Sequence, residues 1–466
     1  MVLNMRESGV GRKLKTGGVF WALLLVSALM LPAKDSLVWQ QDKNKVAAEI
    51  NSWDLAELLE TIAESTGWQI FVEPETKLTV TTKFKDRTPG DALKLLLGDL
   101  SFALLPQKNA PSRLYVFRTT MKEATQMVKV PDKAPARLTR PIADELILTV
   151  KPGTDIDALA KKLGAKVIGR ADGLNTYRLK FEDAEAATSA RETLKTDSSV
   201  ESIENNYPIG RPEQPDAFTG GSFPPLNLNP KVVPDANQII VALVDTGVQP
   251  KGTGMEGFFL PSMSVSGDPA PQSAQPTHGT SMSETILRGI LASMGTGQDS
   301  KVRIQPVDVY GRNETTSTFE VGQGVLKALE KGPRIVNMSL GSYSDSPFLQ
   351  KIISSAHSQG VMFFASAGNQ PVPYPTFPAA QPEVIAVTAA YKGQLAPYAN
   401  FGSFVDVIAP GTVPVTYNNQ SWVVSGTSAS SAYMAGYAAG LFDVSGKAPT
   451  QIETTIRTQF RFSYGR

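Results

Sequence analysis

Four side chains in the C-terminal half of the chain have the chemistry for nucleophilic catalysis. They are Asp245 at the end of "IIVALVD", His278 in "THGTSMSETI", Asn369 in "FFASAGNQP" and Ser428 in "SGTSASSAYMAGYAAG". A serine hydroxyl is a weak nucleophile, and an imidazole with a pKa near neutrality can take its proton. A buried carboxylate would hold the imidazole in one tautomer, while a side-chain amide and a backbone N–H at a helix start would bind the developing oxyanion. Together these residue types predict acyl transfer.

Each of these residues also has a simpler interpretation when it is taken alone. A carboxylate after a strand can cap the next turn, and an asparagine in the same place can form a turn. A single histidine is more often packed or solvated than catalytic, and the small residues around Ser428 would suit close helix packing. The chain has only two histidines, and we expect His357 in "SSAHSQG" on a solvated helix face. The combination of four matched roles favours catalysis.

The composition excludes several other classes of site. The 466 residues include no cysteine and two histidines, which excludes thiol nucleophiles, disulfides and Cys-ligated zinc and nearly excludes a multi-histidine metal site. The 45 Lys+Arg and 44 Asp+Glu nearly cancel, so no nucleic-acid partner is expected. We therefore expect catalysis that requires no cofactor and has no metal in the catalytic site.

The elements that must position these side chains alternate along residues 238–466. Apolar strand runs that alternate with helices predict a parallel sheet covered by helices on both faces. Ligands bind at the carboxyl ends of such strands, where Asp245 and Asn369 lie. The predicted strands are 239–244, 302–309, 334–338, 361–366 and 384–387, and the predicted helices are 279–292, 319–331, 347–359 and 428–441.

Five segments of this region resemble the signature blocks of the subtilisin-like serine proteases. In order they are "VALVDTGV", "HGTSMSETI", "VNMSLGS", "ASAGN" and "GTSASSAYMAG", over about 200 residues. The order Asp, His, Ser is also that of subtilisin. The resemblance implies a subtilisin-like α/β fold in which Asp245 orients the imidazole, His278 is the general base and acid, and Ser428 is the nucleophile. It implies an oxyanion hole made by Asn369 and the Ser428 backbone N–H.

The same resemblance implies two substrate-binding edges, along which an extended polypeptide substrate would pair as an added strand. The residues concerned are Ser339, Leu340, Gly341, Ala365, Ser366, Ala367 and Gly368. The chain departs from the family where Ala432 replaces a usual proline and Ser342 a usual glycine, and neither position touches a reacting atom. The family's calcium loops cannot be located, so structural calcium is left open.

Residues 144–206 are predicted to form a separate α+β domain. The order strand, helix, strand, strand, helix, strand implies a ferredoxin-like split βαβ unit. The segments "ELILTVKPGTDIDALAKKLGAKVIGRADGLNTYRLKF" and "SSVESIENNYP" resemble the propeptides of subtilisin-like proteases. The resemblance implies a folding aid that also acts as an intramolecular inhibitor.

Residues 45–118 are predicted to form another small α+β domain. Leu55, Leu58, Leu59 and Ile62 recur at helical spacing, and a second helix is expected at 89–97. With strands at 68–72, 77–84 and 114–117, the order resembles the short N-terminal domain of secretins and TonB-dependent receptors. The resemblance implies docking to an envelope protein, and a spacer or folding aid is the alternative.

Two further segments are a predicted export signal at the N-terminus and a predicted linker before the C-terminal region. Basic residues precede an apolar run of about 13 residues at 19–31, short of the roughly 20 that span a bilayer, so residues 1–33 read as a cleaved signal peptide. Residues 207–237 contain seven prolines and read as an exposed linker. Proteases cut such linkers. The cut is expected beyond the Tyr207–Pro208 bond, because that bond lacks an N–H.

The sequence thus predicts a secreted or periplasmic serine endopeptidase made as a zymogen that processes its own linker. One alternative is a catalytically silent envelope binding protein that acts through residues 45–118. Another is a membrane-anchored maturation protease, which differs only in the fate of residues 19–33.

Overall fold

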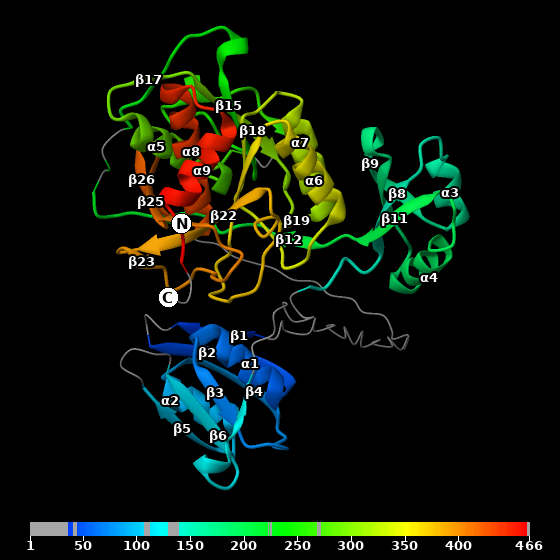
Figure 1. Ribbon diagram of the computed structural model, residues 1–466, viewed down its shortest axis with the longest axis vertical. Helices are drawn as coiled ribbons and strands as arrows, with labels where there is room; N and C mark the ends of the chain where they lie inside the picture. The colour runs from blue at the N-terminus through cyan, green and yellow to red at the C-terminus, as the bar shows by residue number, and fades with distance from the viewer. Residues whose placement is uncertain are drawn as a thin grey trace, which may run out of the picture.

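The computed structural model describes residues 36–40, 44–106, 112–128, 139–221, 223, 226–267 and 272–463. Figure 1 shows three groups of elements, which we call the N-terminal unit (residues 36–128), the middle unit (144–206) and the C-terminal unit (238–463). The predicted signal peptide lies outside the described residues. Among the helices that are described, none is long and apolar enough to cross a membrane.

A mixed eight-stranded sheet forms the centre of the C-terminal unit. Its strand order is β16-β18-β15-β20-β21-β22-β23, with β24 beside β22, and every pair is parallel except β22 with β23. The central strands are almost wholly buried, because they are covered on both faces. The strands are β15 (Ile239–Asp245), β16 (Met263–Ser264), β18 (Val302–Asp308), β20 (Ile335–Met338), β21 (Met362–Ser366), β22 (Val384–Tyr391), β23 (Gln394–Leu395) and β24 (Val407–Pro410).

Two sets of helices enclose this sheet and create two hydrophobic cores. The first core includes side chains of α5 (His278–Met294), α8 (Thr427–Ser445) and α9 (Pro449–Gln459). The second includes those of α6 (Thr318–Leu329) and α7 (Pro347–Ser358). The predicted α/β architecture is confirmed, and each predicted strand and helix of this region ends within a few residues of the observed one.

The contact between α5 and α8 is unusually close. A Cβ added at Gly436 of α8 would lie 1.9 Å from the Ile286 carbonyl oxygen of α5. A Cβ at Gly289 of α5 would lie 2.0 Å from the Tyr433 carbonyl oxygen of α8. Glycine at both positions lets the two backbones approach. Since α5 begins at His278 and α8 carries Ser428 in its first turn, this contact joins the two helices that carry those residues.

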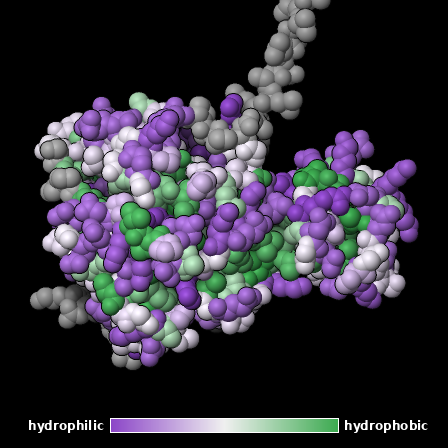
Figure 2. Space-filling model, turned by 90° about the horizontal axis from the view of Figure 1, so that it is seen from above, coloured by the Kyte–Doolittle hydropathy of each residue, from purple (hydrophilic) through white to green (hydrophobic). Residues whose placement is uncertain are grey.

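The middle unit has the predicted ferredoxin-like order of elements. An antiparallel sheet in the order β11-β8-β10-β9 packs against two helices, each begun by an aspartate whose side chain accepts backbone N–H bonds. Figure 1 and, from above, Figure 2 show this unit as a lobe beside the C-terminal unit, next to α6 and α7. The elements are β8 (Glu145–Val150), α3 (Ile156–Lys162), β9 (Lys166–Ala171), β10 (Thr176–Lys180), α4 (Ala184–Leu194) and β11 (Val200–Asn205).

The N-terminal unit contains the two predicted helices and more strands than the sequence indicated. The three-stranded sheet β1-β2-β4 and the four-stranded sheet β5-β6-β3-β7 share one core with both helices. Strands β1, β2, β5 and β7 were not among the predicted elements. The elements are β1 (Ser36–Gln40), β2 (Lys45–Asp54), α1 (Leu55–Thr66), β3 (Gln69–Val72), β4 (Thr79–Arg87), α2 (Pro89–Leu97), β5 (Ser101–Leu105), β6 (Arg113–Phe117) and β7 (Gln126–Met127).

The predicted exposed linker is in part bound to the C-terminal unit. Its strand β12 (Pro208–Gly210) pairs antiparallel with β19 (Thr315–Ser317), and Ile209 is only 2% exposed. Its strand β13 (Asp216–Ala217) pairs antiparallel with β26 (Gln420–Ser425), which forms a hairpin with β25 (Thr412–Tyr417). The linker is therefore exposed over much of its described length but paired in two places, since the backbone groups between the prolines remain free to pair with sheet edges.

Candidate active site

Asp245 and His278 form a buried pair at the carboxyl end of the central sheet. The carboxylate oxygens of Asp245 lie 2.8 and 3.0 Å from His278 Nδ1. Asp245 is fully buried and His278 is 2% exposed. Asp245 Oδ1 also accepts a hydrogen bond of 2.6 Å from the Thr246 N–H. A carboxylate in this position holds the proton on Nδ1 and leaves Nε2 as the basic nitrogen.

The sequence around His278 brings the start of α5 against the end of β15. Thr277 caps the helix by accepting a hydrogen bond from the Thr280 N–H. The Gly279 N–H donates to Thr246 Oγ1 at 2.9 Å, and a Cβ on Gly279 would lie 2.2 Å from the Thr246 carbonyl oxygen. Only glycine allows this approach, so the Gly-Thr pair after the histidine sets the position of the imidazole.

Ser428 lies in the first turn of α8 and lines the same cavity as His278, which has a volume of about 670 Å³. Its hydroxyl donates to the Ser339 carbonyl oxygen at 3.3 Å, and Ser339 Oγ donates to the Ser428 carbonyl oxygen at 3.0 Å. Among the described residues, no hydrogen bond joins Ser428 Oγ to the imidazole. Catalytic hydrogen bonds are often loose until substrate binds, so the arrangement is compatible with a nucleophile and its base.

Asn369 directs its amide towards the same helix start. Its Oδ1 accepts hydrogen bonds of 2.9 Å from both the backbone N–H and the hydroxyl of Thr427. A Cβ at Gly426 would lie 3.0 Å from Asn369 Nδ2, so glycine leaves room for the NH₂ group. The fixed Oδ1 leaves Nδ2 as a donor at the N-terminus of α8, where partial positive charge also favours an anion.

The predicted substrate-binding residues divide into two groups. Gly341, Ser366 and Gly368 line the cavity, and Ser339 contacts Ser428. The side chains of the others are at most 5% exposed and are not among the residues that line the cavity: Leu340, Ala365 and Ala367. These three support the walls of the site from within the core.

Sequence reasoning did not identify the linker residues that enter this cavity. Arg211, Pro212, Glu213 and Gln214 line it, as does Asp216. They lie between β12, which is held by β19, and β13, which is held by β26. The signal available in the sequence was the position of the linker just after the propeptide-like segment, but its pairing partners could not be identified.

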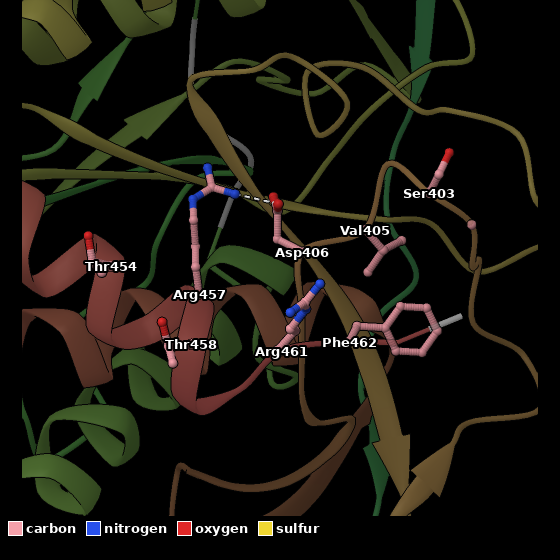
Figure 3. A pocket seen from close by; sticks show the side chains of 9 residues that line it. Ser403, Val405, Asp406, Thr454, Arg457, Thr458, Arg461 and Phe462 are labelled. Carbon is pink, nitrogen blue, oxygen red and sulfur yellow. Dashed lines mark ion pairs between the residues drawn. The ribbon is translucent and has the colours of Figure 1, made fainter. Parts of the chain in front are cut away.

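A second hollow of about 570 Å³ lies between α9 and the loop before β24 (Figure 3). Arg457 occupies one side of it and forms ion pairs with Asp406 and Glu453. The arginine also donates to the Val384 carbonyl oxygen at 3.2 Å. These contacts attach α9 to the sheet. The hollow contains no histidine, so it offers no counterpart of the base at the first cavity.

Two further observations concern metals and the second histidine. Within the described ranges, no group of three His, Asp or Glu side chains is arranged to hold a metal ion. His357, which we expected to be solvated, is half-buried, and its Nε2 lies 3.2 Å from Glu453 Oε2. It belongs to the α7–α9 contact and lies outside the cavity of His278.

Comparison with known proteins identifies similar chains for two of the three units. The model of the Subtilase family matches residues 236–460, and that of the Fervidolysin N-terminal prodomain matches residues 126–206. Subtilisin Savinase of Lederbergia lenta is 30% identical over 207 residues, which cover 43% of this chain and 74% of that protein. The minor extracellular protease Epr of Bacillus subtilis is 29% identical over 329 residues, or 64% of this chain, but only 49% of its own length is matched.

The fold is also similar to that of a solved protease. The epidermin leader peptide processing serine protease of Staphylococcus aureus, in a mutant form, superposes with a TM-score of 0.52 and 17% identity, covering 66% of this chain and 92% of that one. The matched family models start at residues 126 and 236, so the likeness of residues 45–118 to a secretin or TonB-type domain stays a prediction.

Proposed function

Because the chain belongs to the subtilase family, we propose that it is a serine endopeptidase synthesised as a zymogen that processes its own linker. The observation that carries the proposal is the buried Asp245–His278 pair, of which His278 lines one cavity together with Ser428 and residues of the linker. A buried acid–base pair beside a serine at a helix N-terminus suits acyl transfer.

In the proposed mechanism His278 Nε2 takes the proton of the Ser428 hydroxyl as Oγ attacks the carbonyl carbon of the substrate. Asn369 Nδ2 and the Ser428 backbone N–H bind the oxyanion of the tetrahedral intermediate. The intermediate collapses as the imidazolium gives its proton to the leaving amine, and an ester remains on Ser428. Water then attacks this ester with the same base and releases the acid. The steps use protein groups and water, so we propose that no cofactor is required.

The path of the linker supports cleavage within the same molecule. Residues 211–214 line the cavity between the two short strand pairings, as an extended substrate would. The bonds before Pro212 and Pro215 have no N–H, which leaves Pro212–Glu213 and Glu213–Gln214 as the ordinary peptide bonds at the cavity. We expect processing at one of these two bonds.

We also propose that the middle unit acts as the inhibitor. Asn206 Oδ1 accepts hydrogen bonds from the Thr318 hydroxyl and the Phe319 N–H at the start of α6, at 3.0 and 3.1 Å. Arg178 bridges Glu145 within the middle unit and Glu320 of α6, each at 2.8 Å. These contacts would retain the unit after the linker is cut. We further propose an extracytoplasmic location, as the name of Epr indicates for that relative.

The experiment combines labelling with intact mass. An activated fluorophosphonate should label the wild-type protein and should not label Ser428→Ala. On incubation at neutral pH, the wild type should lose its precursor mass through a cut at residue 212 or 213, while Ser428→Ala stays whole. Equal labelling of both proteins would remove the assignment of Ser428. If both stay whole and unlabelled, the peptidase proposal is wrong and a scaffold role takes its place.

A further inference from the structure

Arg211 of the linker occupies a site made for a guanidinium group. Its Nε donates to the Asn313 carbonyl oxygen at 2.9 Å, and its Nη2 donates to the Gly311 carbonyl oxygen at 2.8 Å. The guanidinium carbon lies 5.4 Å from the centre of the Tyr310 ring. Two carbonyl acceptors spaced for one planar fork, together with an aromatic ring, match arginine better than the compact ammonium of lysine.

A buried carboxylate holds the turn that forms this site. Asp308 Oδ1 accepts hydrogen bonds of 2.9 Å from the N–H groups of Tyr310 and Gly311, which fixes the turn that presents the carbonyls. Asp308 is 3% exposed, and among the described residues its Oδ2 has no hydrogen-bond partner.

Tyr310 contributes through its hydroxyl as well as its ring. Burial, with a further contribution from the charge of Asp245, raises the pKa of Tyr310 well above its ordinary value, so the phenol keeps its proton. The hydroxyl donates to the Gly210 carbonyl oxygen at 3.0 Å. One fully buried residue therefore contacts both the side chain of Arg211 and the backbone just before it.

The position of Arg211 in the chain connects this site with catalysis. The pairing of β12 with β19 places Gly210 opposite Thr315, and the Arg211 N–H continues the ladder by donating to the Glu314 carbonyl oxygen at 2.8 Å. The next residues line the cavity of His278 and Ser428. Arg211 is thus the last residue held by the β19 edge before the chain reaches the nucleophile.

We propose that Tyr310 and the carbonyl groups of Gly311 and Asn313 form an arginine-selective substrate subsite, which Arg211 occupies in the precursor and which selects polypeptide substrates with arginine two or three residues before the cleaved bond. This inference rests on the proposed peptidase function. When the processed segment that contains Arg211 leaves, the subsite becomes open to substrates. The same contacts would therefore act first in processing and then in substrate selection.

The first test uses the activated full chain and the synthetic peptide YPIGRPEQPDA, which copies residues 207–217. Its Arg211→Ala version should show a kcat/KM lower by about 10- to 100-fold, since two hydrogen bonds to a charged donor are lost. The Arg211→Lys version should fall between them. The enzyme variant Tyr310→Phe should cut all three peptides more slowly and keep the preference for arginine, because the ring remains.

The second test does not need catalysis. In the Ser428→Ala precursor, the added change Arg211→Ala should raise the rate at which thermolysin cuts the 208–218 segment by about 10-fold, because the segment loses its side-chain anchor. Lys231→Ala, at an exposed basic residue of the same linker, is the control and should leave this rate unchanged.

The outcomes separate the two proposals. Equal kcat/KM for the arginine and alanine peptides, with cleavage that depends on Ser428, would overturn the subsite and leave the peptidase function intact. If no peptide is cut and Ser428 is not labelled, the peptidase function fails. The thermolysin rates then still decide whether the site holds arginine, and equal rates for precursors with and without the Arg211→Ala change would reject it.

Discussion

Glu204 and Phe348 lie 144 positions apart in the chain, yet the Glu204 carboxylate accepts a hydrogen bond of 2.9 Å from the Phe348 N–H. The other carboxylate oxygen accepts one of 2.9 Å from the Ser346 hydroxyl, so a side chain of β11 caps helix α7 of the C-terminal unit. Burial raises the pKa of Glu204 to about 7, against the lowering by the two hydrogen bonds. The middle unit and the C-terminal unit are therefore joined by a group that titrates near neutrality.

The first prediction is that contact between the two units weakens as the pH rises. A group whose pKa is raised from 4.5 to about 7 stabilises the bound state fully below pH 4.5 and loses that contribution through pH 7, which amounts to about 3 kcal/mol. Urea unfolding of the Ser428→Ala precursor between pH 4.5 and 8 measures it. Glu204→Gln should lose this pH dependence, whereas Glu201→Gln, at an exposed residue of the same strand, should keep it. A Glu204→Gln precursor with an unchanged pH profile would contradict the assignment.

The second prediction concerns the tautomer of His278. Asp245→Asn keeps the size of the side chain but can donate a hydrogen bond to Nδ1, which would leave the proton on Nε2, the nitrogen that must act as a base. We expect kcat near neutral pH to fall by about 10⁴-fold, the size of loss that such a change causes in a serine-protease triad. Peptide hydrolysis measured from pH 6 to 10 tests this. A loss below tenfold would show that Asp245 does not orient the base.

The third prediction separates two roles of Asn369. Its Oδ1 stabilises the start of α8 through Thr427, whereas its Nδ2 is the proposed oxyanion donor. Asn369→Ala should lower kcat by about 10²- to 10³-fold, the usual cost of losing one such donor, with little change in KM. Asn369→Ala should also lower the melting temperature, because Thr427 loses its acceptor. Asn369→Asp keeps that acceptor, so it should have the wild-type melting temperature but the low kcat of Asn369→Ala. Recovery of kcat in Asn369→Asp would mean that the residue acts only through the helix.

The sequence predicts well those elements whose structure follows from the size and polarity of their side chains. The apolar runs ending at Asp245 and the small residues after Ser428 predict a buried strand and a close-packed helix, and both are found. Helix α9 was missed because only Ile452 and Ile456 are buried on it. The path of residues 208–217 was missed for another reason. Pairing of β12 with β19 uses backbone N–H and C=O groups, which every non-proline residue has, so no residue type reveals the partner.

The fourth prediction tests whether helix separation sets the distance between base and nucleophile. Gly436→Ala would place a methyl group 1.9 Å from the Ile286 carbonyl oxygen, so α8 must move away from α5. We expect a loss of about 1–3 kcal/mol in unfolding free energy from overpacking, and a fall in the rate of fluorophosphonate labelling at Ser428 even at temperatures where the protein is fully folded. Gly173→Ala is the control, since an added methyl there meets no atom within 4 Å. If Gly436→Ala is destabilised but labels at the wild-type rate, the α5–α8 contact contributes to stability alone and the position of His278 relative to Ser428 is set by the sheet.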